Sequence, residues 1–190
     1  MHPARIAVIY HASFADDEAL DLLEANKDKH FVAPGLAWLV NTSFHASQWG
    51  LSPEVTKKMG YHRELEIAVE TLRKMLKRGI RILPGGDYGF AMTPHCQNAR
   101  DLEFFVKYLG FTPMEAIRSA TLYGGQIMMK PDELGLVKDG FLADLLLVDG
   151  DPLANLSILR DPKRILAVMK DGVFAKAPEI AAERAWGRAA

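Results

Sequence analysis

The stretch Ile80-Arg81-Ile82-Leu83-Pro84-Gly85-Gly86-Asp87 decides the fold class. Its short apolar run predicts a strand that is covered on both faces, as in a parallel sheet flanked by helices. Pro84 and the two glycines end regular structure where a carboxylate appears. Because parallel α/β proteins place their chemistry at the carboxyl ends of strands, Asp87 is the first candidate for a functional residue. The alternative is a turn aspartate that hydrogen-bonds to its own backbone.

Two similar apolar runs precede this stretch and extend the pattern. Arg5 to Tyr10 and His30 to Pro34 each predict a short buried strand, and His11 directly follows the first. A helix is expected to start at Ser13, and a second helix follows from the apolar spacing between Glu64 and Lys77. Strands that alternate with helices indicate a parallel sheet with crossover helices.

The segment between Gly35 and Leu51 lacks a clear period and contains His45 and Trp49. We expect a long loop over one end of the domain, and loops of this length are often lids. These two side chains would line such a lid, or simply pack the loop.

After Asp87 the sequence predicts a loop and further helices, and its character changes at Pro131. A loop with His95 and Cys96 leads to a predicted helix from Ala99 to Leu109, and Thr112-Pro113-Met114-Glu115 is a capping-box start for the next helix. From Pro131 onward, short apolar runs separated by turn sequences predict a small β-unit. Its strands are expected at Leu134–Val137, Ala143–Val148 and Ile165–Met169, and a terminal helix from Pro178 to Ala190. The predicted division is residues 1–130, 131–176 and 177–190.

Composition excludes several classes of protein. Of the 190 residues, 49% are hydrophobic, which is enough for a sizeable core. A net charge of −1 gives no support for binding to nucleic acid or to a membrane surface. Cys96 is the only cysteine, so the chain offers neither an internal disulfide nor a thiolate metal cluster, and a cytoplasmic location is expected. No apolar run approaches the ~20 residues of a membrane span.

Five motifs in order resemble the metal-dependent amidohydrolase superfamily, in particular its imidazolonepropionase-like and prolidase-like branch. The resemblance runs from about Ile6 to Ala175. The motifs are Ile9-Tyr-His-Ala-Ser-Phe-Ala-Asp-Asp-Glu-Ala-Leu20, Leu83-Pro-Gly-Gly-Asp87, His95-Cys-Gln-Asn-Ala-Arg-Asp-Leu-Glu103, Thr112-Pro-Met-Glu-Ala-Ile-Arg-Ser-Ala-Thr121, and Leu134-Gly-Leu-Val-Lys-Asp-Gly-Phe-Leu-Ala-Asp-Leu-Leu-Leu-Val-Asp-Gly-Asp-Pro152.

The resemblance implies an α/β fold: the C-terminal part of a (β/α)₈ TIM-type barrel plus part of a small β-sandwich. The strands that end at His11, Pro34 and Asp87 would be the sixth, seventh and eighth of the barrel. A whole barrel needs roughly 250 residues, and the family's first-strand His-x-His pair, fourth-strand lysine and fifth-strand histidine have no counterpart here. We therefore expect a C-terminal fragment, one part of a split protein or a truncated product. Its expected partner is the N-terminal half of the barrel or a second copy.

The resemblance also implies a site. His11 and Asp87 would bind a divalent metal, with zinc as the expected ion, and Asp87 would carry a proton from the metal-bound water to the leaving amine. His95 would orient the substrate. Without the resemblance, His11 reads as a core histidine and His95 as a loop residue that caps the next helix. Tyr10 stands where relatives often have an acid.

Two hypotheses for function follow. In the first, the chain is part of a hydrolase that cleaves a C–N bond, in an amide, a cyclic amide or a dipeptide, of a small-molecule substrate by metal-activated water. In the second, it is a catalytically incomplete half-barrel that needs a partner chain and has no turnover alone. A chain that lacks His-x-His is not expected to complete a site by self-association.

Overall fold

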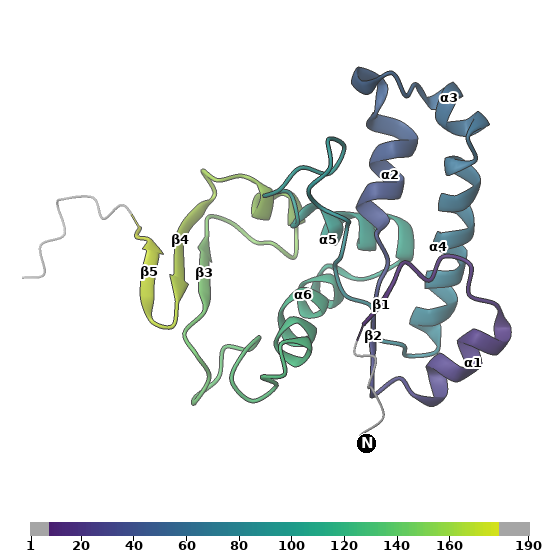
Figure 1. Cartoon of the computed structure of the whole chain (residues 1–190). Coiled ribbons are helices and arrows are strands. Elements are labelled where there is room, and N and C mark those ends of the chain that lie inside the picture. The colour runs from purple at the N-terminus through teal and green to yellow at the C-terminus, as the bar shows by residue number, and fades with distance from the viewer. Residues whose placement is uncertain (1–7, 179–190) are drawn as a thin grey trace, which may run out of the picture.

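A computed structural model describes residues 8–178 of the chain as an α/β unit followed by a small antiparallel sheet (Figure 1). Strands β1 and β2 lie parallel beside the segment around Ile82, with helices packed around them. This last segment was predicted as a strand but forms only a single bridge to β2, at Ile82. In chain order the helices are α1 (Asp17–Ala25), α2 (Leu36–His45), α3 (Pro53–Lys58), α4 (Tyr61–Lys77), α5 (Arg100–Phe104) and α6 (Pro113–Ile127); the strands are β1 (Val8–Tyr10), β2 (Phe31–Ala33), β3 (Leu145–Val148), β4 (Ile165–Lys170) and β5 (Val173–Lys176).

The parallel arrangement predicted from the strand and helix order is present. Val8 pairs with Phe31 and Tyr10 with Ala33, while Val32 forms a parallel bridge with Ile82. The pairing continues past the strand ends, because the N–H of Gly35 donates to the carbonyl of Gly85 at 2.6 Å. All three carboxyl ends therefore lie at one edge of the sheet.

Apolar side chains from the strands and helices form one main core. Val32 and Ile82 are almost fully buried, and Leu36, Leu72 and Phe105 pack in the same cluster. The helix predicted between Ala99 and Leu109 is present, but its second half is a π-helical segment, η2 (Phe105–Leu109). The core thus holds α2, α4 and α5 against the sheet, and with them the loops that follow the strands.

The segment from Gly35 to Leu51 is not a long loop, and this prediction was wrong. It forms α2 and a short 3₁₀ turn, η1 (Ser47–Trp49). Seven of the ten residues of α2 are buried, including Asn41, Thr42 and Ser43. A helix that is buried nearly all round has no single apolar stripe, so its sequence shows no helical period.

The predicted start of the first helix was also wrong. Asp16, not Ser13, is the N-cap of α1, and its side chain accepts a hydrogen bond from the N–H of Ala19 at 2.9 Å. Ser13 is instead buried in the turn that precedes the helix. Both residues are good caps, so the sequence pattern could not choose between them.

The small sheet differs from its prediction at its first strand. Leu134–Val137 is not a strand; this segment packs against the second half of α6, where a Cβ on Gly135 would lie 2.2 Å from the carbonyl oxygen of Thr121. The sheet is instead β3-β4-β5, in which β5 follows the predicted Lys170-Asp171-Gly172 turn. The expected strand residues Arg5–Ala7 and nearly all of the predicted terminal helix lie outside the described residues.

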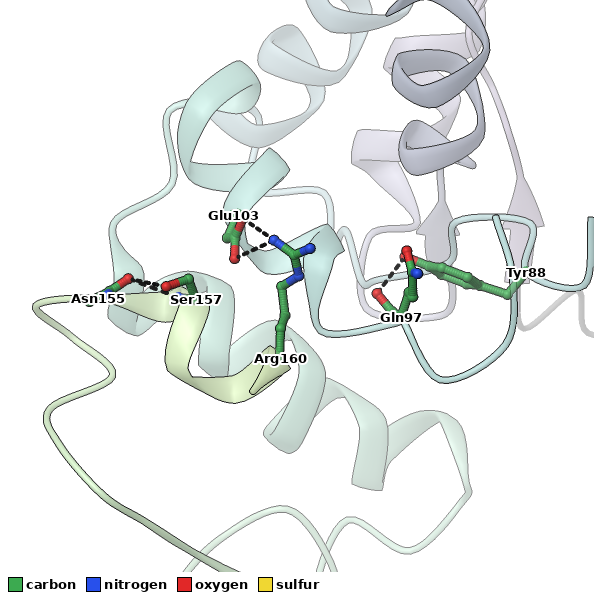
Figure 2. A network of polar contacts seen from close by, with 6 residues as sticks. All are labelled: Tyr88, Gln97, Glu103, Asn155, Ser157 and Arg160. Carbon is green, nitrogen blue, oxygen red and sulfur yellow. Dashed lines mark hydrogen bonds and ion pairs between the residues drawn. The ribbon is translucent and has the colours of Figure 1, made fainter. Parts of the chain in front are cut away.

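A 3₁₀ helix fixes the small sheet to the α/β unit. This helix, η3 (Leu156–Arg160), contributes buried Leu156 to the main core. In Figure 2, Arg160 donates from Nη1 to both carboxylate oxygens of Glu103 on α5, at 3.0 and 3.2 Å. Asn155 caps the same helix by accepting from the N–H of Ser157 at 3.0 Å. The docking therefore combines apolar burial with an ion pair.

Candidate active site

His11 and Asp87 meet at the carboxyl edge of the parallel sheet. His11 Nε2 lies 3.6 Å from Asp87 Oδ2, and both side chains are partly open to solvent. One residue follows β1 and the other follows the segment around Ile82, with β2 between them. The structure therefore brings together the two residues that the sequence singled out as metal ligands.

The backbone at both residues has an unusual conformation. His11 has φ +65° and Asp87 has φ +54°, in the left-handed region that non-glycine residues seldom adopt. His11 is held there by its N–H, which donates to Ala33 O at 2.8 Å, and Thr93 Oγ1 donates to Asp87 O at 2.5 Å. Such strain at two facing polar residues is typical of functional sites.

Gly35 provides the space between these residues. It lies between β2 and α2, and a Cβ at this position would lie 2.7 Å from His11 Nδ1. The same Cβ would be 3.8 Å from Asp87 Oδ2. Any larger residue at this position would therefore displace the imidazole ring of His11. Gly35 also has φ +65°, a backbone conformation that favours glycine.

A buried carboxylate, which the sequence reasoning missed, lies against the glycine that precedes Asp87. Asp101 on α5 is 1% exposed, and Gly86 approaches so closely that a Cβ there would lie 2.9 Å from Asp101 Oδ1. Burial raises the pKa of Asp101 to about 7, against the opposing effect of the nearby Gly85 and Ala37 N–H groups and the Tyr88 hydroxyl. Neither carboxylate oxygen has a hydrogen bond of normal geometry within residues 8–178. The only available signal was an acid on the apolar face of a predicted helix.

His95 lies in the exposed loop after Asp87. Its ring packs against Gly89, where a Cβ would be 3.4 Å from Nε2 and Cε1. Within the described residues, its side chain makes no hydrogen bond or ion pair with His11 or Asp87. A role of His95 in orienting substrate stays a prediction.

The potential ligand atoms at this edge are of types that bind a divalent metal, but there are too few of them for a complete site. Imidazole nitrogen and carboxylate oxygen are both zinc ligands, and a catalytic zinc ion is held by three protein ligands. Residues 8–178 contain no group of three His, Cys, Asp or Glu side chains that could hold a metal ion. His11 and Asp87 can therefore supply two ligands, and a complete site needs further ligands.

Comparison with known proteins gives one family. The family description "Amidohydrolase family" matches residues 4–175. Ochratoxinase of Aspergillus niger is 26% identical over 172 residues, which are 90% of this chain and 34% of that protein. The chain thus spans about a third of the length of the curated relatives that it matches.

Solved structures show the same partial overlap. A putative prolidase from Bifidobacterium longum has 27% identity and a TM-score of 0.76, over 93% of this chain and 44% of that one. A Xaa-Pro dipeptidase with bound methionine in its active site has 28% identity and a TM-score of 0.71, over 91% and 40%. The α/β fold of this chain therefore corresponds to less than half of these proteins. Among the described residues, no helix is both long and apolar enough to cross a membrane.

Proposed function

Because the chain belongs to the amidohydrolase family, we propose that it carries the C-terminal part of a metal-dependent site that hydrolyses a C–N bond. The observation that carries this proposal is the 3.6 Å approach of His11 Nε2 and Asp87 Oδ2 at the carboxyl edge of the sheet. In this proposal the three parallel strands are strands six to eight of a barrel, and β3 to β5 are part of a β-sandwich. The substrate is a small amide, cyclic amide or dipeptide, as the prolidase and ochratoxinase names of the relatives suggest.

His11 and Asp87 have different tasks in the proposed site. His11 would be a neutral ligand and Asp87 an anionic one for a divalent ion, with zinc expected. Such an ion, when bound, lowers the pKa of a coordinated water and so provides a nucleophile near neutral pH. Asp87 would accept a proton at a carboxylate oxygen and deliver it to the leaving amine. The remaining ligands would come from residues that this chain does not contain.

Metal binding tests this proposal. The chain is combined with the upstream portion of a prolidase-like relative, supplied as a separate protein, and zinc content and hydrolysis of Xaa-Pro dipeptides and N-acyl amino acids are measured. We expect Asp87→Asn to reduce hydrolysis at least 100-fold and His11→Asn to reduce zinc content. Asp132→Asn, a change at an exposed acid, is the matched control and should alter neither. Hydrolysis that persists in Asp87→Asn would refute the assignment.

A second candidate is a half-barrel that binds a partner without turnover of its own. Two observations favour it: residues 8–178 offer only two ligands at the site, and β3 to β5 leave apolar side chains exposed. Purified alone, the chain would then bind substoichiometric zinc and show no hydrolysis. Stoichiometric zinc together with turnover by the isolated chain would exclude this candidate.

A further inference from the structure

The first turn of α2 has no cap from its own N-cap residue. That residue is Gly35, which has no side chain to accept a hydrogen bond, and a larger residue would meet the ring of His11. The first N–H groups of a helix lack partners within the helix, and a side-chain oxygen of the N-cap residue usually accepts one of them. The helix that begins beside the candidate active site therefore needs an acceptor from elsewhere in the chain.

Asp101 on α5 is the acid that reaches this turn. Its carboxylate is 1% exposed. Burial raises the pKa of Asp101, and the N–H groups of Gly85, at the strand end, and of Ala37, in the first turn of α2, oppose this effect. A carboxylate beside a helix N-terminus is favoured by the partial positive charge there. Asp101 thus links the start of α2 to the backbone that leads to Asp87.

The glycines before Asp87 connect these two elements directly. A Cβ on Gly86 would lie 2.9 Å from Asp101 Oδ1, so only a glycine lets the backbone pass so close to the acid. The carbonyl of Gly85 accepts a hydrogen bond from the N–H of Gly35 at 2.6 Å. A shift of the Asp101 carboxylate would therefore move both the strand end and the N-cap of α2.

Tyr88 brings a third polar group to the same carboxylate. Burial, and then the charge of Asp101, raise the pKa of Tyr88, so its hydroxyl stays protonated and can donate. This hydroxyl donates to Gln97 O at 3.3 Å, which is long for an O–H donor (Figure 2). Asp101 is the other acceptor beside it. Residues on both sides of Asp87 are therefore close to one buried carboxylate.

We propose that Asp101 is a positioning residue of the candidate active site: its carboxylate holds the strand end and the first turn of α2 together, and so sets the approach of Asp87 to His11. Two carboxylate oxygens can accept several hydrogen bonds at once, whereas an amide offers one oxygen and a nitrogen that would face an N–H group. The inference rests on the proposed function only in treating His11 and Asp87 as metal ligands. The geometry itself can be measured without a metal.

Nuclear Overhauser effects in the isotope-labelled, metal-free full chain test the proposal. A Cβ at Gly35 would lie 3.0 Å from His11 Cε1, so the wild type should show a cross-peak between Gly35 Hα and His11 Hε1. Asp101→Asn keeps the shape of the side chain and removes a buried charge, so the variant should stay folded, but the cross-peak should lose at least half of its intensity. Glu103→Gln is the matched change on the same helix, at an acid that pairs with Arg160, and should keep the full intensity.

Titration of the same proteins with zinc chloride, followed at the His11 ring, is the second measurement. Asp101→Asn should raise the dissociation constant at least 5-fold without unfolding at a lower temperature than the wild type. A residue that only supported the fold would lower stability and affinity together. An unchanged cross-peak or zinc affinity in Asp101→Asn, an equal loss in Glu103→Gln, or no cross-peak in the wild type would overturn the proposal. Failure of the wild type to support hydrolysis bears on the proposed function alone, because the cross-peak is recorded without metal.

Discussion

At the scale of the residue, the candidate site consists of polar groups that the fold holds under constraint. His11 and Asp87 have positive φ angles, Gly35 leaves room for an imidazole ring, and Asp101 is buried without a hydrogen bond of normal geometry. Each of these arrangements has a free-energy cost, which the surrounding core must offset. These residues gather in space at the carboxyl edge of the sheet.

The raised pKa of Asp101 predicts a specific dependence of stability on pH. An unfolded aspartate has a pKa of about 3.9, whereas burial raises that of Asp101 to about 7. Between these values the folded chain keeps a proton that the unfolded chain has lost, so stability falls as pH rises from about 4 to 7. Asp101→Asn removes this term, and the variant should gain on the order of 2–4 kcal/mol over the wild type at pH 8 but little at pH 4.5.

Thermal unfolding of both proteins across this pH range measures the effect. Asp132→Asn, which replaces an exposed acid, should show the same pH dependence as the wild type. A parallel pH dependence for Asp101→Asn and the wild type would mean that Asp101 ionises normally in the folded chain.

The sequence predicted the positions of His11 and Asp87 but not their support. A residue directly after a buried strand must lie at the sheet edge, so the pair could be expected to meet. Asp101 and Asn41 are buried by packing between helices that are distant in the sequence. Burial of this kind depends on tertiary contacts, and no local pattern reports it.

At the scale of the element, local signals succeeded where the hydrogen bonds are local. Thr112 Oγ1 accepts from the N–H of Glu115 at 3.2 Å, and Glu115 Oε2 accepts from the N–H of Thr112 at 2.8 Å, which is the capping box expected from the sequence. The N–H of Thr112, and then its hydroxyl, which also donates to Glu115 Oε2 at 2.8 Å, lower the pKa of Glu115. Local signals failed for α2, because a helix buried on most sides has no polar face to reveal its period.

The capping box predicts a measurable contribution to stability. Thr112→Ala removes both the acceptor for the Glu115 N–H and a partner of its carboxylate, and should reduce the free energy of unfolding by about 1 kcal/mol. Thr121→Ala, in the middle of the same helix, removes only a hydroxyl that bonds to Ile117 O, and should change it by less than about 0.5 kcal/mol. Chemical denaturation compares the two; equal losses would indicate that the cap contributes nothing specific.

At the scale of the whole molecule, the α/β unit and the small sheet differ in how well their apolar side chains are buried. The first has one continuous core, whereas β3 to β5 expose Leu146, Leu147, Val173 and Phe174 at 58%, 53%, 71% and 51%. Successive strand residues point to opposite faces, so both faces of the small sheet carry exposed apolar side chains. Exposed apolar surface of this extent is typical of an interaction site. The partner expected from the sequence, an N-terminal half or a second copy, stays a prediction, and the division near residue 130 remains one as well.

Self-association of the isolated chain follows from this exposed sheet. We expect the mass measured by light scattering or sedimentation to rise with concentration, and Leu146→Lys combined with Val173→Lys to return it to that of a monomer. Val137→Lys is the matched control, because Val137 is 90% exposed but lies outside the sheet. A monomeric wild type at all concentrations, or equal rescue by Val137→Lys, would show that the sheet is not the contact.

The docking of η3 on α5 has a consequence for limited proteolysis. The connection from residue 128 to 144 contains no helix or strand and is mostly exposed, so it is open to cleavage. A single cut there would leave Leu156 in the main core and Arg160 on Glu103. The two fragments should therefore co-purify after digestion and separate only in denaturant, as a nicked complex that keeps its shape without a continuous backbone.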